Sequence, residues 1–353
     1  MVLSEKCNES VEGSAVTRER DCGVDLIRVA ACCAVVGLHT FSNGLTTFSS
    51  ISYYFCGFAV PVFFMASGAF LLNRGGVTYS YSIRKIKQLA AVLIRWVLVI
   101  SFCIGVGGYV FGAEELIAIP KLFLSTFKGT LLQRGLLSHC WFLWSLSFIY
   151  ILLPTLSRLS MSRKRLIFGV TVSLGLLVHI FSCVVGMPLE ALVPQAFRIW
   201  IWLEYFLLGG LIYPLCKKGV RVWTSGMFLA VSTIVAVGWQ LFAGSFLMPE
   251  TACAAHAEYF YDSVTCVVWC SALFVFVEAL RPSRKPWIHL ASLTMGVYLF
   301  HKLVISFAGC FIPLDDVVWD SGVGFLAVLF SSFVLVGIIK KIIPNVFDSF
   351  CRL

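Results

Sequence analysis

Charged residues are scarce in this chain. Asp, Glu, Lys and Arg make up 13% of its 353 residues, whereas soluble globular domains have about 25%. Hydrophobic residues make up 59%, and they gather in long blocks. This pattern excludes a soluble globular protein and is typical of an integral membrane protein.

The first 20 residues lack the apolar core of a secretory signal peptide, since seven of them are charged. We interpret residues 1–23 as a polar cytoplasmic leader, 24–345 as a single transmembrane domain and 346–353 as a short cytoplasmic tail. The sequence shows no internal repeat and no linker between soluble domains. Insertion is therefore expected to depend on the first apolar run.

Several catalytic and metal-binding motifs are also missing. The sequence has no P-loop, Rossmann glycine pattern, kinase motif set, GxSxG elbow, HxxxH or HExxH. The 14 Cys include many in apolar runs without metal-ligand spacing, so we interpret these as small buried hydrophobes and predict no metal. The net charge of +9 resides largely in short loops, which argues against a nucleic-acid partner.

Ten apolar runs are long enough to cross about 30 Å of hydrocarbon. They predict an all-α polytopic membrane protein with about ten transmembrane helices. The runs lie at residues 24–42, 53–72, 90–111, 140–157, 166–186, 198–215, 223–243, 262–280, 290–310 and 322–340.

Lys and Arg cluster in every second connection between these runs, starting with the one after the second run. By the positive-inside rule these connections and both termini are cytoplasmic.

Two connections on the opposite side are long. The apolar spacing around Pro120 in 112–138 predicts a helix on the membrane surface. The other, 244–261, either binds a polar acceptor or is a solvated loop, and its polar and aromatic residues are Glu250, His256, Glu258, Tyr259 and Tyr261.

The first apolar run carries three ionisable residues, Asp25, Arg28 and His39. At 100° per residue they fall on one helical stripe, with Arg28 and His39 roughly 16 Å apart along the axis. An unpaired charge at mid-bilayer costs roughly 3 kcal/mol or more. The stripe is therefore expected to face other helices or a wet cavity, where a substrate fits between Arg28 and His39.

Two other histidines belong to the same half of the predicted bundle. His139 opens the fourth run on the outer side, and His301 lies within the ninth. Together with His39 they either approach one cavity or each hydrogen-bond a neighbouring helix.

In the inner loop YSIRKIK, Arg84 and Lys87 are three residues apart on one helical face. This spacing either suits a polyphosphate ligand or reflects only the excess of basic residues in cytoplasmic loops.

In combination, these residues resemble the family-3 integral-membrane acyltransferases over almost the whole chain. Within that family the chain is most similar to the short sugar O-acetyltransferases of the enterobacterial common antigen type. The matching positions are Asp25, Leu26, Arg28 and His39, the block VPVFFMASG at 60–68 with Ser67, the block HCWFL at 139–143 with His139 and Trp141, and Tyr298, Leu299 and His301.

The resemblance implies transfer of an acyl group, usually acetyl, from acetyl-CoA to a hydroxyl of a cell-envelope glycan or lipid-linked sugar at the plasma (inner) membrane. It implies that Arg28 and His39 are an essential pair. It also places Arg84 and Lys87 where the family often has two arginines near the CoA entrance. Lys87 departs from that pattern, because lysine lacks the bidentate fork of arginine.

The chemistry of these side chains agrees with such a reaction. A neutral histidine is well matched to taking a proton from a hydroxyl at neutral pH, so His39 is the expected general base, and a covalent acyl-His39 intermediate is the alternative. Arg28 would bind CoA phosphate or polarise the thioester, with Asp25 orienting it. The rival function is a transporter of a small polar solute, although the inverted repeats common in carriers are absent.

Overall fold

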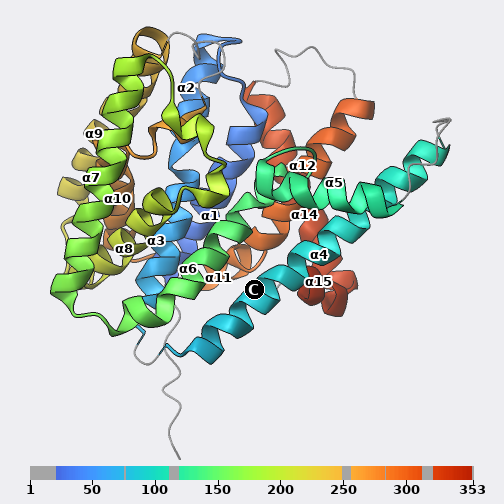
Figure 1. Cartoon of the computed structure of the whole chain (residues 1–353), viewed down its shortest axis with the longest axis horizontal. Coiled ribbons are helices and arrows are strands. Elements are labelled where there is room, and N and C mark those ends of the chain that lie inside the picture. Colours follow the sequence, from blue (N-terminus) through green and yellow to red (C-terminus); the bar gives the residue numbers. More distant parts are fainter. Residues whose placement is uncertain are drawn as a thin grey trace, which may run out of the picture.

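Helices account for the regular secondary structure of the part of the chain that the computed structural model describes, and no strand occurs there (Figure 1). The described residues are 21–74, 77–110, 119–248, 256–282, 284–311 and 321–351. The prediction of an all-α polytopic membrane protein is confirmed. Residues 1–20 of the predicted leader and Glu250 lie outside the described residues.

Each predicted span corresponds to helical structure. Within the described residues, eight helical segments are long and apolar enough to cross a membrane, while α10 is shorter at 17 residues and α12 has 18. Because α10 begins at Val264, Asp262 lies just outside its span. The helices in the predicted spans are α1 (Cys22–Thr40), α2 (Thr47–Phe55) with α3 (Ala59–Leu71), α4 (Tyr79–Val110), α6 (Trp141–Arg158), α7 (Met161–Val185), α8 (Ile199–Cys216), α9 (Val222–Phe242), α10 (Val264–Leu280), α12 (Thr294–Phe311) and α14 (Gly322–Ile342).

The second span differs from its predicted bounds. Its helix α2 begins at Thr47, where the Thr46 side chain accepts a hydrogen bond from the Ser49 amide, and a 3₁₀ turn at Cys56–Phe58 separates α2 from α3. Pro61 explains the interruption, because proline has no N–H to donate to the carbonyl four residues earlier. Hydropathy alone does not show such a break.

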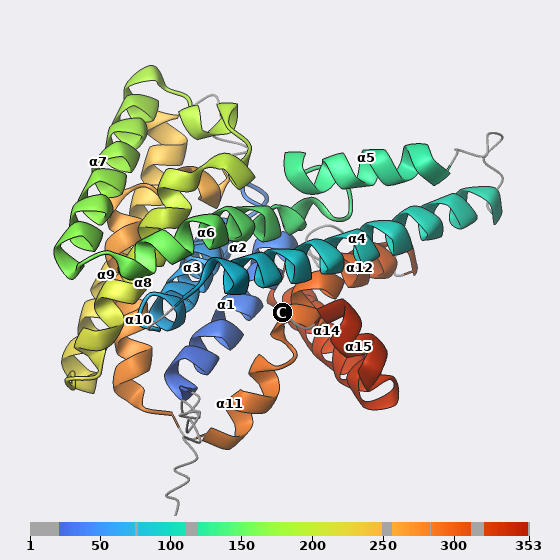
Figure 2. The ribbon, with the colours of Figure 1, turned by 60° about the horizontal axis from the view of Figure 1, so that its bottom comes forward.

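Three shorter α-helices of the described part of the chain lie outside these spans. In the long connection after α4, α5 (Ile119–Leu132) runs beside α4, with Pro120 in its first turn (Figure 2); proline suits that position. Helix α11 (Arg284–Ala291) precedes α12. The residues predicted as a tail form most of α15 (Pro344–Cys351), whose Phe350 carbonyl accepts a hydrogen bond from Trp96 of α4 at 3.2 Å. The C-terminal segment is thus part of the bundle.

Helix α1 lies at the centre of the bundle and packs against α3, α10, α12 and α14. Of its apolar window 67% is buried, against 22% for α7 and for α14. The outer helices therefore present apolar side chains outwards, as expected of helices that contact lipid.

The ends of alternate helices gather at one end of the bundle. Lys217, after α8, contacts Asp21 before α1 at 2.5 Å and Glu278 of α10 at 2.7 Å. Arg158, at the end of α6, lies over the Tyr79 ring at the start of α4. Each contact joins helix ends that an alternating path through a membrane puts on the same side. We call this the basic end of the bundle, and the opposite end the outer end.

Helices α3 and α8 cross at backbone distance because glycines line the contact. A Cβ atom built on Gly68 would lie 1.8 Å from the Phe206 carbonyl oxygen, and one on Gly209 would lie 2.0 Å from the Met65 carbonyl oxygen. Small residues allow this close approach of membrane helices. The α3–α8 pair is thereby fixed in position beside α1.

We expect Gly209→Ala to destabilise the protein by about 1–3 kcal/mol, because the added methyl group forces α3 and α8 apart. Thermal unfolding in detergent measures this as a lower midpoint. Gly238→Ala in α9 is the matched control, since no atom beyond the adjacent backbone of α9 lies within 4 Å of its built Cβ. Equal losses in the two variants would contradict a specific α3–α8 contact.

Candidate functional site

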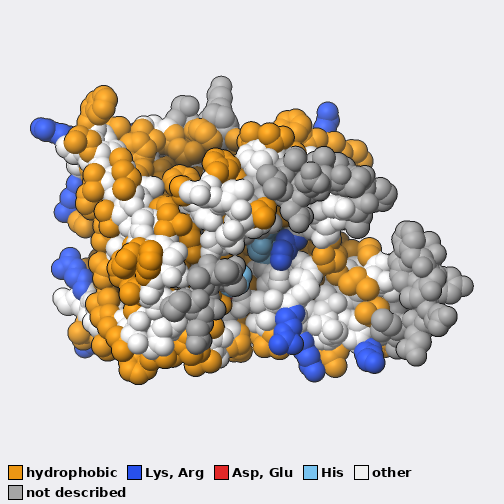
Figure 3. Space-filling model, turned by 90° about the horizontal axis from the view of Figure 1, so that it is seen from above, with side chains coloured by type: hydrophobic (Ala, Val, Ile, Leu, Met, Phe, Trp, Pro, Cys, Tyr) orange, Lys and Arg blue, Asp and Glu red, His pale blue; other side chains and the backbone are white. Residues whose placement is uncertain are grey.

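A cavity of about 1300 Å³ passes between the helices from the basic end towards the outer end. Its lining includes Arg28 and Lys85 near the basic end, His39 and His139 deeper inside, and Glu258 at the outer end. Figure 3 shows the outer end of the bundle, where histidine side chains lie inside a hollow. The cavity therefore connects groups that belong to opposite ends of the protein.

The polar stripe of α1 faces this cavity. The Arg28 side chain is 38% exposed, whereas Asp25 is buried at 2%, and their charged groups are 4.0 Å apart. Arg28 and His39 both line the cavity, and the helical rise places them roughly 16 Å apart along α1. A long, thin molecule lying along α1 would reach both side chains.

Three histidines from different helices meet at the end of this stripe. The His39 ring lies 5.1 Å from the His301 ring in a stacked arrangement and 6.3 Å from the His139 ring. The rings of His139 and His301 are 5.0 Å apart. The structure thus brings together the three histidines that the sequence singled out, and His39 and His139 line the cavity.

The three histidines differ in their burial and in their hydrogen bonds. His301 is fully buried, and its Nδ1 donates to the Val297 carbonyl at 3.2 Å, so its Nε2 keeps the lone pair. The Tyr298 hydroxyl donates to the backbone carbonyl of His139. His39 is exposed to the cavity, and no side chain or backbone group of the described residues is hydrogen-bonded to its ring. Its nitrogens are available to a molecule in the cavity.

The basic loop contributes a different lysine from the one the sequence indicated. Arg84 and Lys87 are exposed outside the cavity lining, whereas Lys85 and Tyr81 are part of that lining. Arg84 contacts Tyr81, which lines the cavity: its guanidinium lies 5.6 Å from the centre of the Tyr81 ring. The rotation of α4 about its axis decides which of these cations faces inwards.

Lys302 is a site residue that the sequence reasoning missed. It lines the cavity beside His301, and its ammonium donates to the Ser138 hydroxyl at 2.6 Å. The sequence did contain a signal for it, because Lys302 lies inside the apolar run 290–310. Burying an ionisable side chain within a membrane span costs free energy, so such residues usually have a function.

The remaining predicted positions, Ser67 and Trp141, also line the cavity. The Ser67 hydroxyl donates to the Phe63 carbonyl at 3.0 Å, and the Trp141 ring packs on Trp202 with centroids 4.9 Å apart. Both side chains thus shape the wall of the cavity.

Outside the cavity lining, one buried group among the described residues has the composition of a metal site. It is formed by His179, Glu190 and Asp262.

Comparison with known proteins agrees with this arrangement. Residues 23–341 match an acyltransferase domain. The chain belongs to the family-3 acyltransferases. It is also similar to an amino-acid racemase of Enterococcus faecalis, with 24% identity over 345 residues that cover 90% of this chain and 46% of the racemase. The chain thus spans about half the length of that relative, and no solved structure matches it.

The different exposure of the histidines in this acyltransferase domain predicts different reactivity. We expect diethyl pyrocarbonate to modify His39 faster than His301 in detergent-solubilised protein, because His301 is fully buried and His39 is open to the cavity. Peptide mass mapping over a time course measures both rates. Equal rates would show that the cavity does not expose His39 selectively.

Proposed function

We propose that this protein is an O-acyltransferase of the plasma (inner) membrane that moves an acyl group, most simply acetyl, from acyl-CoA to a hydroxyl of a cell-envelope glycan or lipid-linked sugar. The observation that carries this proposal is that Arg28 and His39 line one continuous cavity in a chain of the family-3 acyltransferases. The resemblance to short sugar O-acetyltransferases supports the choice of donor and acceptor.

The basic end of the cavity suits the donor. Acyl-CoA carries several phosphate charges, and phosphates bind strongly to positioned arginine and lysine. Arg28, Lys85 and Lys340 all line the cavity there, and the Tyr81 ring offers a flat surface beside them. The narrow pantetheine arm would then extend along α1 towards the histidines.

At the far end of the stripe, His39 would take the proton of the acceptor hydroxyl while its oxygen attacks the thioester carbonyl. The carbon–sulfur bond breaks, and CoA leaves as the thiol after it receives that proton. In the covalent alternative, His39 itself attacks the thioester and later passes the acyl group to the acceptor. His301, stacked on His39, holds the ring in place in either route.

A carrier of a small polar solute is the second candidate. The cavity lining extends towards both ends of the bundle, which also suits a transport path. Transfer of radiolabelled acetyl from acetyl-CoA to envelope glycan by purified protein in liposomes would support the enzyme. Uptake of a solute without acyl transfer would support the carrier.

We expect His39→Gln to lower the rate of acetyl transfer at least about 100-fold, the range for losing a general base. Glutamine keeps much of the shape and hydrogen bonding of histidine but does not take up a proton near neutral pH. Folding is checked by size-exclusion chromatography and CoA binding by calorimetry, and both should be retained. A variant that transfers acetyl at the normal rate would make His39 a structural residue.

A pair of neighbouring lysines tests the donor site. Lys85→Gln should raise the KM for acetyl-CoA more than it lowers kcat, because Lys85 lines the cavity. Lys87→Gln is the matched control, since Lys87 is exposed two residues further along α4. A larger effect at Lys87 and Arg84 would favour the assignment made from sequence over the placement in the structure.

A further inference from the structure

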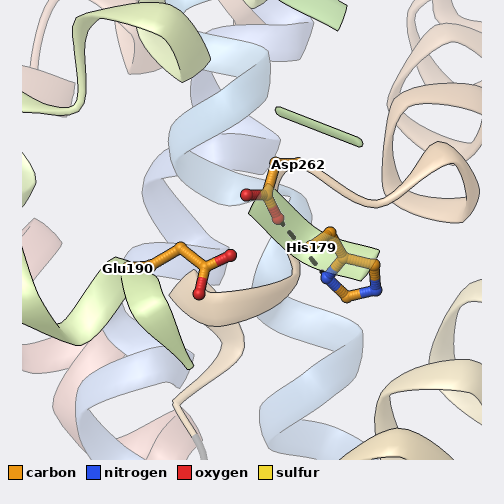
Figure 4. A group of neighbouring side chains, drawn as sticks. All are labelled: His179, Glu190 and Asp262. Carbon is orange, nitrogen blue, oxygen red and sulfur yellow. Dashed lines mark ion pairs between the residues drawn. The ribbon is translucent and has the colours of Figure 1, made fainter. Parts of the chain in front are cut away.

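Three buried polar side chains converge near the outer end of the bundle, outside the cavity lining. They are His179 on α7, Glu190 in the 3₁₀ turn Leu189–Leu192, and Asp262 just before α10 (Figure 4). Their exposed fractions are 3%, 0% and 2%. One potential ligand atom of each lies within 4.8 Å of the others. Three segments that are far apart in the sequence therefore meet at one point.

The path of the chain after α7 brings Glu190 back beside that helix. Helix α7 ends at Gly186, whose left-handed conformation (φ 80°) turns the chain. The Ser182 hydroxyl of α7 accepts a hydrogen bond from the Leu189 amide at 2.9 Å and donates to Oε2 of Glu190 at 3.0 Å. Oε1 of Glu190 has no hydrogen-bond partner among the described residues. One oxygen of this carboxylate is thus fixed in position, and the other is available to a ligand.

The other polar atoms at this point also lack hydrogen bonds. Nδ1 of His179 and Oδ1 of Asp262 are 3.5 Å apart, but neither atom, nor Oδ2 of Asp262, has a hydrogen-bond partner in the described part of the chain. Buried polar groups in proteins almost always have a partner, because leaving them without one is strongly unfavourable. A ligand that contacts all three side chains would supply the missing interactions.

The charges of the group indicate that this ligand is a cation. Glu190 and Asp262 bring two carboxylates into one buried space. No Lys or Arg of the described residues forms an ion pair with either of them, and Arg198 at the start of α8 pairs instead with Glu258 at 3.2 Å. Two anions that are buried together repel each other, whereas a divalent cation between them balances both charges.

The combination of ligands suits a transition metal. Imidazole and carboxylate groups bind zinc at about 2.0–2.2 Å, so neighbouring ligand atoms of a tetrahedral zinc ion are about 3.4 Å apart. The distance between Nδ1 of His179 and Oδ1 of Asp262 is 3.5 Å. A further carboxylate is close, because Oε2 of Glu204 and the side chain of Asp262 border the same space over Gly175. Both oxygens of Glu204 lack a hydrogen bond from the described residues.

The neighbours of Nε2 in His179 are compatible with metal binding at Nδ1. A metal at Nδ1 requires the ring proton on Nε2, whereas the indole nitrogen of Trp239 donates to Nε2 at 3.1 Å. Sγ of Cys183 lies 4.0 Å from the same Nε2 and accepts a proton weakly. Metal binding would therefore exchange the hydrogen bond from Trp239 for one to Cys183, a small cost beside the gain from coordination.

We propose that His179, Glu190 and Asp262 bind one divalent transition-metal ion, zinc being the best match, and that this ion ties segment 256–262 to α7. Asp262 ends this segment, which forms part of the outer wall of the cavity. The members of the segment that line the cavity are His256, Glu258, Tyr259 and Tyr261. The metal site itself does not rest on the proposed function. The sequence predicts no metal because these ligands lie in three separate segments and form no local motif.

Zinc binding to the purified full-length protein in detergent tests the site. After treatment with EDTA, titration calorimetry should show one zinc ion bound per chain with a Kd of about 1 μM or lower. Affinity should fall at least about 100-fold in Asp262→Asn and in Glu190→Gln, since each removes a charged ligand. If the wild-type protein binds neither zinc nor manganese, the proposal is wrong.

A variant of the cavity distinguishes this site from the histidines that line it. His39→Gln should bind zinc as tightly as the wild type, because His39 does not belong to the group. Loss of binding in His39→Gln together with normal binding in Asp262→Asn would place the zinc ion in the cavity and would overturn the proposal.

Thermal unfolding separates the loss of a ligand from damage to the fold. In EDTA, Asp262→Asn should unfold at the same temperature as the wild type or at a higher one, because it removes a buried charge that lacks a partner. With zinc in excess the order should reverse, since the midpoint of the wild type should rise by several degrees while that of the variant stays constant. A wild-type midpoint that zinc does not raise would contradict the proposal.

Hydrogen–deuterium exchange tests whether the ion holds the outer wall. Zinc should increase the protection of residues 256–262 roughly tenfold in the wild type and leave it unchanged in Asp262→Asn. Stabilisation by calcium or magnesium chloride, but not by zinc or manganese chloride, would remove His179 from the ligands and overturn the assignment of a transition metal. None of these measurements uses acyl transfer, so a negative result here leaves the proposed function intact.

Discussion

The exclusion of water from the bilayer is the constraint on which this structure depends. Every ionisable side chain within the helices must either find a partner in the protein or reach a wet space. On α1 the constraint is met in both ways, because Asp25 is buried near Arg28 while Arg28 and His39 line the cavity. At the outer end His179, Glu190 and Asp262 are buried together, with one potential ligand atom of each within 4.8 Å of the others. The two polar groups thus differ chiefly in their access to solvent.

Periodicity and hydropathy were sufficient to predict the helices and the shared stripe of Asp25, Arg28 and His39, because these depend on local spacing. The position of Lys85 in the cavity lining was not predictable in this way. It depends on the rotation of α4 against its neighbours, which tertiary packing determines. His179 is a similar case, since its contacts come from Trp239 and Asp262, which are far apart in sequence.

The central helix also relates the two ends of the proposed reaction. A donor held at Arg28 and an acceptor held beside His256 and Glu258 would approach from opposite ends of one cavity and meet near His39. The protein then need not carry either molecule across the membrane whole. In the proposed reaction only the acyl group would pass from one end to the other, which is a smaller task for a domain of this size.

The glycine contact between α3 and α8 affects how the cavity wall is able to deform. With carbonyl groups occupying the space of a Cβ atom, those two helices cannot move closer or slide without collision. On the other side, α4 and α5 extend away from the bundle (Figure 2) and meet α6 and α15 through side chains such as Trp96 and Trp144. The wall of the cavity that α3 forms is therefore held in place by α8, and a substrate has to fit beside it without separating the two helices.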